Sequence, residues 1–248
     1  MTLPRRLGSI YARIALTYRA KAGSLLLIAA AVFVPVGFLD ALTTTADVES
    51  IDFASGLHVL AVVAATALIT MSGLLGEVFY SGAVAVSLTH PHDERPPSAL
   101  EVARRLDYKR LILVDVVYVL FVIVGLLIFF VPGILVFVWF GLAGPVVEIE
   151  GRGVVAALRR SASLVRGNFW VVFLVLAPVE LLGDVVAELI EHGVHDLLGD
   201  SLFSTWLAES ASNIAFTPIF ALAAVLLTLD LIGRHDGKGG SPATRPSP

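Results

Sequence analysis

The stretch GPVVEIEGRGVVAALRRSASLVRGNFW, residues 144–170, decides how the chain is organised. It starts in apolar sequence, passes the carboxylates Glu148 and Glu150, crosses a basic segment, and returns to apolar sequence at Phe169. This order is typical of a chain that leaves a membrane, lies along its surface and enters it again. We therefore predict an amphipathic interfacial helix over residues 151–167.

The composition supports a membrane environment for the whole chain. The 248 residues have a mean hydropathy of +0.87 and are 57% hydrophobic. Charged residues make up 15% of the chain, against roughly 25% in soluble domains. A soluble protein of this size could not bury so much apolar surface. The absence of cysteine excludes disulfides, thiolate metal sites and cysteine nucleophiles.

Working outward from residues 144–170, hydropathy predicts an all-α polytopic membrane protein with six transmembrane helices in three hairpins. A basic amphipathic interfacial helix precedes each hairpin, at about 4–22, 98–110 and 151–167. The spans are predicted at about 24–42, 56–89, 111–131, 134–147, 169–190 and 205–232.

The third and fourth spans are expected to meet in a hairpin at Pro132 and Gly133, because neither residue extends a helix comfortably. The fourth span is short, so it is either a tilted crossing or a partial one. Residues 1–232 are read as a single membrane domain, and residues 233–248 as a disordered cytosolic tail.

The basic residues are sorted by region. All 17 Lys and Arg fall on one side of the six-span arrangement, and the opposite segments, 43–55, 132–133 and 192–204, contain none. The positive-inside rule then predicts that both termini are cytoplasmic in a multi-pass protein of the cell membrane, whether inner or plasma.

Three segments resemble one another: ARIALTYRAKAGSLLLI, ARRLDYKRLILVDVVY and ALRRSASLVRGNFWVVF. Each has an early alanine and arginine, a second basic residue, and then a return to apolar sequence. Repetition of a unit that cannot bury its own polar face suggests a pseudo-symmetric bundle.

Charged groups inside a bilayer cost several kcal/mol unless they are paired or hydrated, so acids within the spans are candidate sites. These are Glu77, Asp115, Glu148, Glu180, Asp184 and Asp230. Four of them, Glu77, Asp115, Glu148 and Asp230, are expected on the cytosolic side. Their candidate partners, which could equally contact lipid headgroups, are Arg13, Arg104, Arg105, Arg159, Arg160 and Arg166. The acids clamp the interfacial helices to the bundle, line a proton or substrate pathway, or are exposed to water without a role.

Glu180 and Asp184 lie one helical turn apart, at a depth where no Lys or Arg is predicted. They must be protonated, hydrated in a cavity, or paired with a polar group such as Ser212 or Asn213. A water-filled cavity and a helix that reaches the surface early are both compatible with the pattern.

Motifs for catalysis are missing. The chain has no P-loop, no G-x-S-x-G, no H-E-x-x-H and no dinucleotide-binding glycine fingerprint. Glu188, His192 and His195 share a helical face, but their spacing matches no known metal signature and fits solvated residues. We predict no metal and no cofactor. Enzymatic activity stays open, with the pattern favouring a protein that is not an enzyme.

The central stretch resembles the membrane domain of glycerophosphoryl diester phosphodiesterases. The resemblance lies in Pro132-Gly133, Pro145-Val-Val-Glu148, Gly151, Ala157-Leu-Arg-Arg-Ser161, Leu164-Val-Arg-Gly167 and Phe169-Trp170, and extends over about residues 98–175. It implies that Glu148, Arg159, Arg160, Ser161 and Asn168 belong to the family signature. That family includes stand-alone multi-pass proteins. In its fused members the phosphodiesterase activity belongs to a separate soluble barrel, for which this chain has no room.

The expected function is a non-catalytic integral membrane module. It would bind or move a lipid-like or small hydrophobic substrate, or serve as a membrane subunit for a partner. The alternative is a proton-coupled secondary transporter that uses the intramembrane carboxylates, and a membrane-embedded hydrolase is the third reading. The expected partners are the lipid bilayer, anionic lipid headgroups and either a second copy or a membrane partner protein, but no nucleic acid.

Overall fold

All the secondary structure in the part of the chain that the structure describes is α-helical. The structure is a computed structural model, and it describes residues 3–44, 80–82, 84, 85, 88, 104, 106–128 and 130–239. Its helices are α1 (Leu3–Thr44), α4 (Tyr108–Ile128), α5 (Phe130–Phe140), α6 (Ala143–Glu150), α7 (Val154–Val165), α8 (Phe169–Leu198) and α9 (Leu202–Gly239). This confirms the predicted all-α class.

Four described stretches are long and apolar enough to cross a membrane: Leu3–Phe38, Val131–Glu150, Phe169–Leu198 and Leu202–His235. They make the chain a multi-pass membrane protein. They contain the predicted spans 134–147, 169–190 and 205–232 and most of the predicted span 24–42. Most of the predicted span 56–89 lies outside the described residues. The predicted span 111–131 corresponds to α4, which is not among the four stretches. Within the described part, the candidate crossings therefore number four and not six.

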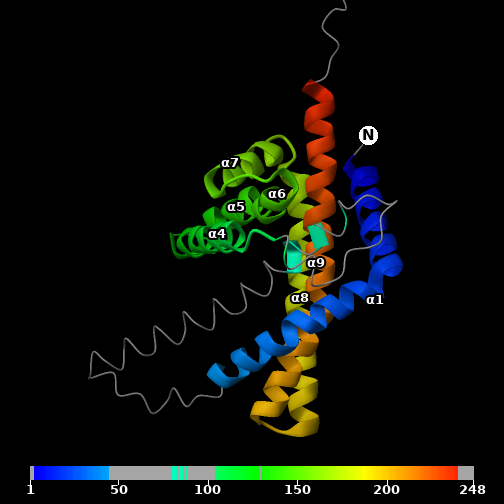
Figure 1. The fold of residues 1–248 in the computed structure, drawn as a ribbon, viewed down its shortest axis with the longest axis vertical. Coiled ribbons are helices and arrows are strands. Elements are labelled where there is room, and N and C mark those ends of the chain that lie inside the picture. Colours follow the sequence, from blue (N-terminus) through cyan, green and yellow to red (C-terminus); the bar gives the residue numbers. More distant parts are fainter. Residues whose placement is uncertain are drawn as a thin grey trace, which may run out of the picture.

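The N-terminal segment differs from its prediction. Instead of an interfacial helix followed by a separate span, α1 is one continuous helix of 42 residues that bends along its length (Figure 1). Gly23 does not interrupt it, because a glycine inside a helix costs only about 1 kcal/mol and leaves the hydrogen-bond ladder intact. The three similar segments therefore do not fold alike: the first stays within α1, α4 begins inside the second at Tyr108, and the third is divided between α7 and α8.

In residues 144–170, the helices end and begin where the sequence predicted. Helix α7 is a separate element, bounded by Gly151 with φ of 63° before it and Gly167 with φ of 80° after it. Both angles lie in the left-handed region, which glycine adopts at little cost. α7 buries Ala157, Leu158 and Leu164 and exposes Arg159 and other polar residues on its opposite face. Its apolar face packs on the bundle, as expected of an amphipathic helix.

The turn between α4 and α5 lies earlier than predicted. α4 ends at Ile128 and α5 begins at Phe130, so Pro132 and Gly133 sit in the first turn of α5 and not in the turn itself. Proline is well tolerated in a first helical turn, because the amide it lacks would have no helical partner there. The contacts between Phe121 and Phe140 and between Gly125 and Gly133 show that α4 and α5 run antiparallel.

Helix α9 is the centre of the bundle. It forms a long hairpin with α8, while α1 crosses it on one side and the shorter helices α4 to α7 lie on the other (Figure 1). Eight consecutive residues, 221–228, are buried. A helix stretch that is buried all round must be covered on every face. Close approach is possible because Gly37 of α1 lies directly against Ser210 of α9, where an added Cβ would stand 2.7 Å from Oγ of Ser210.

The C-terminal end also differs from its prediction. α9 continues as a helix to Gly239, past the predicted start of a disordered tail at residue 233. The ion pair between Arg234 and Asp230, one turn apart, supports these last turns. Residues 240–248 lie outside the described part of the chain.

Candidate functional site

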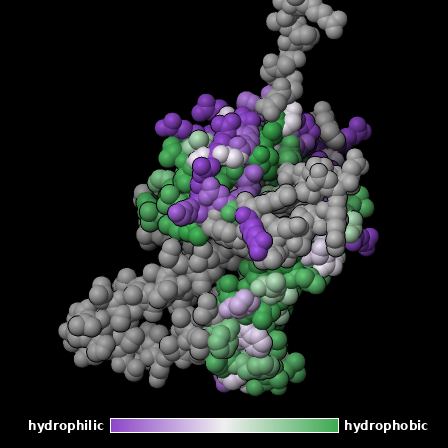
Figure 2. Space-filling model, viewed as in Figure 1, coloured by the Kyte–Doolittle hydropathy of each residue, from purple (hydrophilic) through white to green (hydrophobic). Residues whose placement is uncertain are grey.

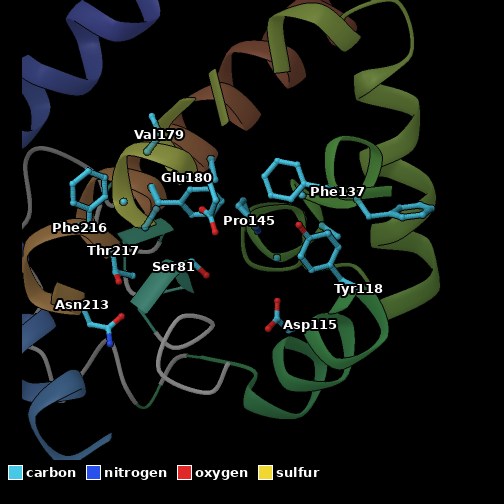
Figure 3. Close-up of a pocket in the computed structure, with 18 of the residues that line it drawn as sticks. Ser81, Asp115, Tyr118, Phe137, Pro145, Val179, Glu180, Asn213, Phe216 and Thr217 are labelled. Atoms are coloured by element: carbon cyan, nitrogen blue, oxygen red, sulfur yellow. The ribbon is translucent and has the colours of Figure 1, made fainter. Parts of the chain in front are cut away.

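A cavity of about 210 Å³ lies among α4, α5, α6, α8 and α9. Figure 3 shows side chains from these helices converging on it, together with Ser81. The wall includes both polar and aromatic groups, so the cavity is suited to an amphipathic occupant.

Three carboxylates line the cavity: Asp115 from α4, and Glu180 and Asp184 from α8. Among the described lining residues there is no Lys, Arg or His. Ser212 and Asn213, which the sequence suggested as polar partners of the α8 acids, lie in the same wall. The structure therefore brings the two α8 acids to a cavity, and it adds a third acid from another helix.

Asp115 was expected near the basic interfacial helices, but it lies in the cavity wall with its carboxylate toward the interior (Figure 3). Its Oδ2 atom is buried and has no hydrogen-bond partner in the described part of the chain. The distribution of charged residues along the sequence indicates the depth of Asp115 in the membrane, and it does not indicate which helix this residue faces. Tyr118, which sequence reasoning missed, lines the cavity as well. Tyr118 follows Asp115 by three positions, so the two lie on one face of the helix. This spacing could have identified Tyr118 from the sequence.

The rest of the wall is largely apolar and aromatic. Phe137 and Phe140 come from α5, and Phe216 and Phe220 from α9. Gly183 of α8 lies against Phe216, such that an added Cβ would stand 2.8 Å from Cδ1 of the ring. This glycine therefore leaves room for the ring beside the acids.

A second polar cluster joins the ends of several helices. Asp230 accepts hydrogen bonds from Arg6 at 3.1 Å and from Arg234 at 2.8 Å, so it ties α1 to α9. Arg6 also donates to Oδ1 of Asn168 at 2.7 Å, in the turn before α8. Asp230 was a predicted clamp, but Arg6 and Arg234 were not among its predicted partners.

Glu150 is the second acid of this polar cluster. It accepts hydrogen bonds from Arg160 at 3.0 Å and also pairs with Arg152. Arg160 in turn approaches Nδ1 of His235 at 3.4 Å, which brings α7 to the end of α9. Sequence reasoning noticed Glu150 but did not count it among the candidate acids. Figure 2 shows hydrophilic side chains gathered at the end of the molecule where α7 and the last turns of α9 lie.

The other predicted basic residues are surface groups. Arg13, Arg104, Arg159 and Arg166 are exposed. Glu77 and Arg105 lie outside the described residues. Glu148 faces the protein interior in part, and its Oε1 atom is buried without a partner among the residues described. Among the described acids, Asp230 and Glu150 are the ones that pair with arginines of other helices.

The residues singled out by the family resemblance have identifiable contacts. Oγ of Ser161 donates to the carbonyl of Trp139 at 2.7 Å and is part of a fully buried residue. Nδ2 of Asn168 donates to the carbonyl of Leu164 at 3.2 Å, while its Oδ1 receives Arg6. These contacts fix α7 against α5 and the start of α8, which is a structural role.

The histidine-bearing end of α8 forms local contacts. Nδ1 of His195 lies 2.9 Å from Oδ1 of Asp200, and Nδ1 of His192 lies 2.8 Å from the carbonyl oxygen of Glu188. Within the described ranges, no group of three or more His, Asp or Glu residues is arranged to hold a metal ion.

The chain matches no protein-family model, no curated protein and no solved structure. Its function therefore has to be argued from the cavity and from the polar cluster.

Proposed function

We propose that the protein is a non-catalytic integral membrane module that binds a small hydrophobic or lipid-like substrate in the cavity among α4, α5, α6, α8 and α9. The cavity itself is the observation that supports this function. Binding sites in helical membrane proteins lie between helices, combine apolar walls with a few polar groups, and are where intramembrane acids are found. The volume of about 210 Å³ is below the roughly 300–1,000 Å³ of sites for drug-sized ligands, which favours a small ligand or one end of a longer one.

The arrangement in the membrane is part of the same proposal. We place both termini in the cytosol and assign six crossings to the whole chain, on the basis of the one-sided distribution of Lys and Arg. The exposed residues Arg13, Arg159 and Arg166 then contact anionic headgroups, each contributing about 1 kcal/mol near an acidic leaflet. The resemblance to the membrane domain of glycerophosphoryl diester phosphodiesterases agrees with such a stand-alone module. A second copy or a membrane partner would cover apolar surface that lipid covers otherwise.

Filling the cavity tests the proposal. Because the chain has no cysteine, Ala187→Cys in the cavity wall is a unique reporter whose labelling by N-ethylmaleimide measures access. We expect neopentylbenzene, a small neutral hydrocarbon, to slow this labelling several-fold in the detergent-solubilised protein. Adding Gly183→Leu should remove the protection, because the new side chain and the displaced Phe216 ring take up the space.

Gly193→Leu is the matched control for this experiment. Gly193 lies on the same helix, is exposed, and has no neighbouring atom within 4 Å of an added Cβ. It should leave the protection unchanged. Equal protection in the Gly183→Leu protein, or no protection in the parent, would contradict binding in this cavity.

A second candidate, a proton-coupled transporter, is favoured by the acids of the cavity wall. Three carboxylates share one wall, and Oδ2 of Asp115 is buried without a partner among the described groups. Such a carboxyl can take up and release a proton as the cavity hydrates. In proteoliposomes that carry a pH gradient, Asp115→Asn should abolish gradient-driven uptake of a cavity ligand. Uptake at the parent rate would exclude Asp115 as the proton carrier.

A further inference from the structure

The charge in the cavity wall has only one sign. Asp115, Glu180 and Asp184 come from two different helices, and no basic residue is among the described lining groups. Carboxylates that share a wall repel one another, and Asp115, whose Oδ2 is buried, also loses hydration energy. A positively charged occupant would relieve both costs, whereas a neutral or anionic occupant would relieve neither.

Two polar groups in the wall have no partner in the described part of the chain. Oδ2 of Asp115 is a buried atom without a hydrogen bond, although its carboxylate points toward the cavity (Figure 3). Ser212 is only 8% exposed, lines the cavity, and makes no hydrogen bond to a described residue. Buried polar groups are normally satisfied, so unsatisfied ones beside a cavity indicate that an occupant supplies the missing contacts. These groups are independent of the acids of α8.

The aromatic groups of the wall fit the same kind of occupant. Phe216, Phe137 and Tyr118 line the cavity together with the acids. In Figure 3, Phe216 lies on one side of Glu180, and Phe137 and Tyr118 lie on the other. Aromatic faces attract organic cations through their quadrupole, and they pack against apolar substituents. A bare metal ion is less suited, because the described residues hold no metal-binding group of three or more acids or histidines.

The α8 acids of the cavity wall lie beside an apolar surface of the same helix. Glu180 and Asp184 are exposed, and the same turns of α8 expose Leu181, Leu182 and Val185 at 64%, 58% and 54%. In a membrane these apolar side chains would lie against lipid. A molecule could therefore place its charged end among the acids and its apolar end between the helices.

We propose that the cavity selects a small organic monovalent cation, an ammonium group that carries an apolar substituent. This inference rests on the proposed function, that the cavity binds a ligand, and it names the chemical class of that ligand. The three acids bind the charge, the aromatic rings bind the substituent, and Ser212 orients the ligand through a hydrogen bond.

The test compares two ligands of the same shape and different charge. Benzyltrimethylammonium and neopentylbenzene differ in one atom, a quaternary nitrogen in place of a carbon. Protection of Ala187→Cys from N-ethylmaleimide gives the apparent affinity of each. We expect the cation to bind at least about tenfold more tightly, as charge attraction and cation–π contacts add to one shared hydrophobic contact. Phenylacetate, an anion of similar size, should give no protection.

Neutralisation of one acid shows whether the cavity causes the preference. Asp115→Asn should bring the affinity ratio of the two ligands close to one. Asp196→Asn removes an exposed acid of α8 that does not line the cavity, and the ratio should stay as in the parent. Elution and melting of each variant show that it is folded. An unchanged ratio in Asp115→Asn would overturn the role of that residue.

The outcomes separate this inference from the proposed function. Equal protection by the cation and the hydrocarbon would contradict the preference for a cation but agree with a hydrophobic binding site in the cavity. Protection by neither compound would contradict both proposals. Butyltrimethylammonium and dodecyltrimethylammonium then distinguish two sources of the same chemistry. Protection by both identifies a small soluble cation, whereas protection by the long chain alone identifies a lipid-like amphiphile that enters from the bilayer.

Discussion

Replacing Asp230 with asparagine is expected to lower the melting temperature of the detergent-solubilised protein by about 10 °C. Asp230 is the carboxylate that Arg6 reaches across 224 positions of sequence, and their side chains are only 16% and 12% exposed. Removing one partner of a largely buried ion pair leaves the other charge uncompensated, which costs about 3 kcal/mol. For a chain of this length, each kcal/mol shifts the melting temperature by roughly 2–4 °C.

Arg6 depends on this partner more than a surface arginine would. Its Nε atom is buried and has no hydrogen bond to a described residue, and its remaining contacts are Asp230 and Asn168. An asparagine at position 230 keeps the size of the side chain but removes the charge. The predicted loss therefore measures electrostatics and not packing. Unfolding can be followed by the aggregation of a fluorescent fusion during heating.

Arg234→Gln supplies the matched control. Arg234 donates to the same carboxylate at 2.8 Å, but its side chain is 45% exposed. Exposed pairs contribute roughly 0–1 kcal/mol, so the expected change is at most a few degrees. Arg6→Gln should be far less stable than Arg234→Gln. If the two arginine substitutions lowered the melting temperature equally, burial would not determine how much these ion pairs stabilise the protein. The predicted contribution of the ion pair between α1 and α9 would then be wrong.

The sequence could predict features that depend on local pattern. Apolar runs located α8 and α9, and the change from apolar to basic residues located α7, because hydropathy and helical periodicity are properties of neighbouring residues. Glu180 and Asp184 were recognised as a pair for the same reason, since one helical turn separates them. Ser212 and Asn213 followed from the α8–α9 hairpin, which returns the chain to a similar depth.

Contacts between distant segments could not be predicted in this way. Asp115 belongs to the cavity because α4 packs beside α8, and no local pattern specifies that neighbour. Arg6 was assigned to the interface, although it reaches Asp230 near the other end of the chain. The pair of Glu150 and Arg160 spans only 10 positions, but Glu150 was not among the acids for which Arg160 was a candidate partner. Depth in a membrane can be inferred from one sequence, whereas the pairing of groups at one depth requires the packing.

The antiparallel contact of α4 and α5 shows how strongly that packing is constrained. A Cβ added at Gly125 would stand 3.0 Å from both Cα and N of Gly133 and 3.2 Å from the carbonyl carbon of Pro132. These neighbours are backbone atoms, so no change of side-chain rotamer can relieve the contact. Glycine at position 125 is therefore required for the two helix axes to approach, as small residues allow in membrane helices.

We expect Gly125→Leu to destabilise the protein by about 3 kcal/mol, near the upper end of the usual cost of overpacking, because α4 and α5 must separate. The same variant should raise the reactivity of Ala187→Cys, since Phe137 and Phe140 of α5 form part of the cavity wall and would move with the helix. Heating of the detergent-solubilised protein and labelling with N-ethylmaleimide measure the two effects separately.

Gly193→Leu is again the control, because it distinguishes the effect of close packing from the effect of replacing a helical glycine with leucine. It makes the same substitution in a helix, but at a position with open space around the added atoms. Leucine favours the helix over glycine by roughly 1 kcal/mol, so this variant should be as stable as the parent or slightly more stable. If Gly125→Leu melted at the temperature of Gly193→Leu, the close contact between Gly125 and Gly133 would contribute nothing to the stability of the protein. The cavity wall formed by α5 would then have to be held by other contacts.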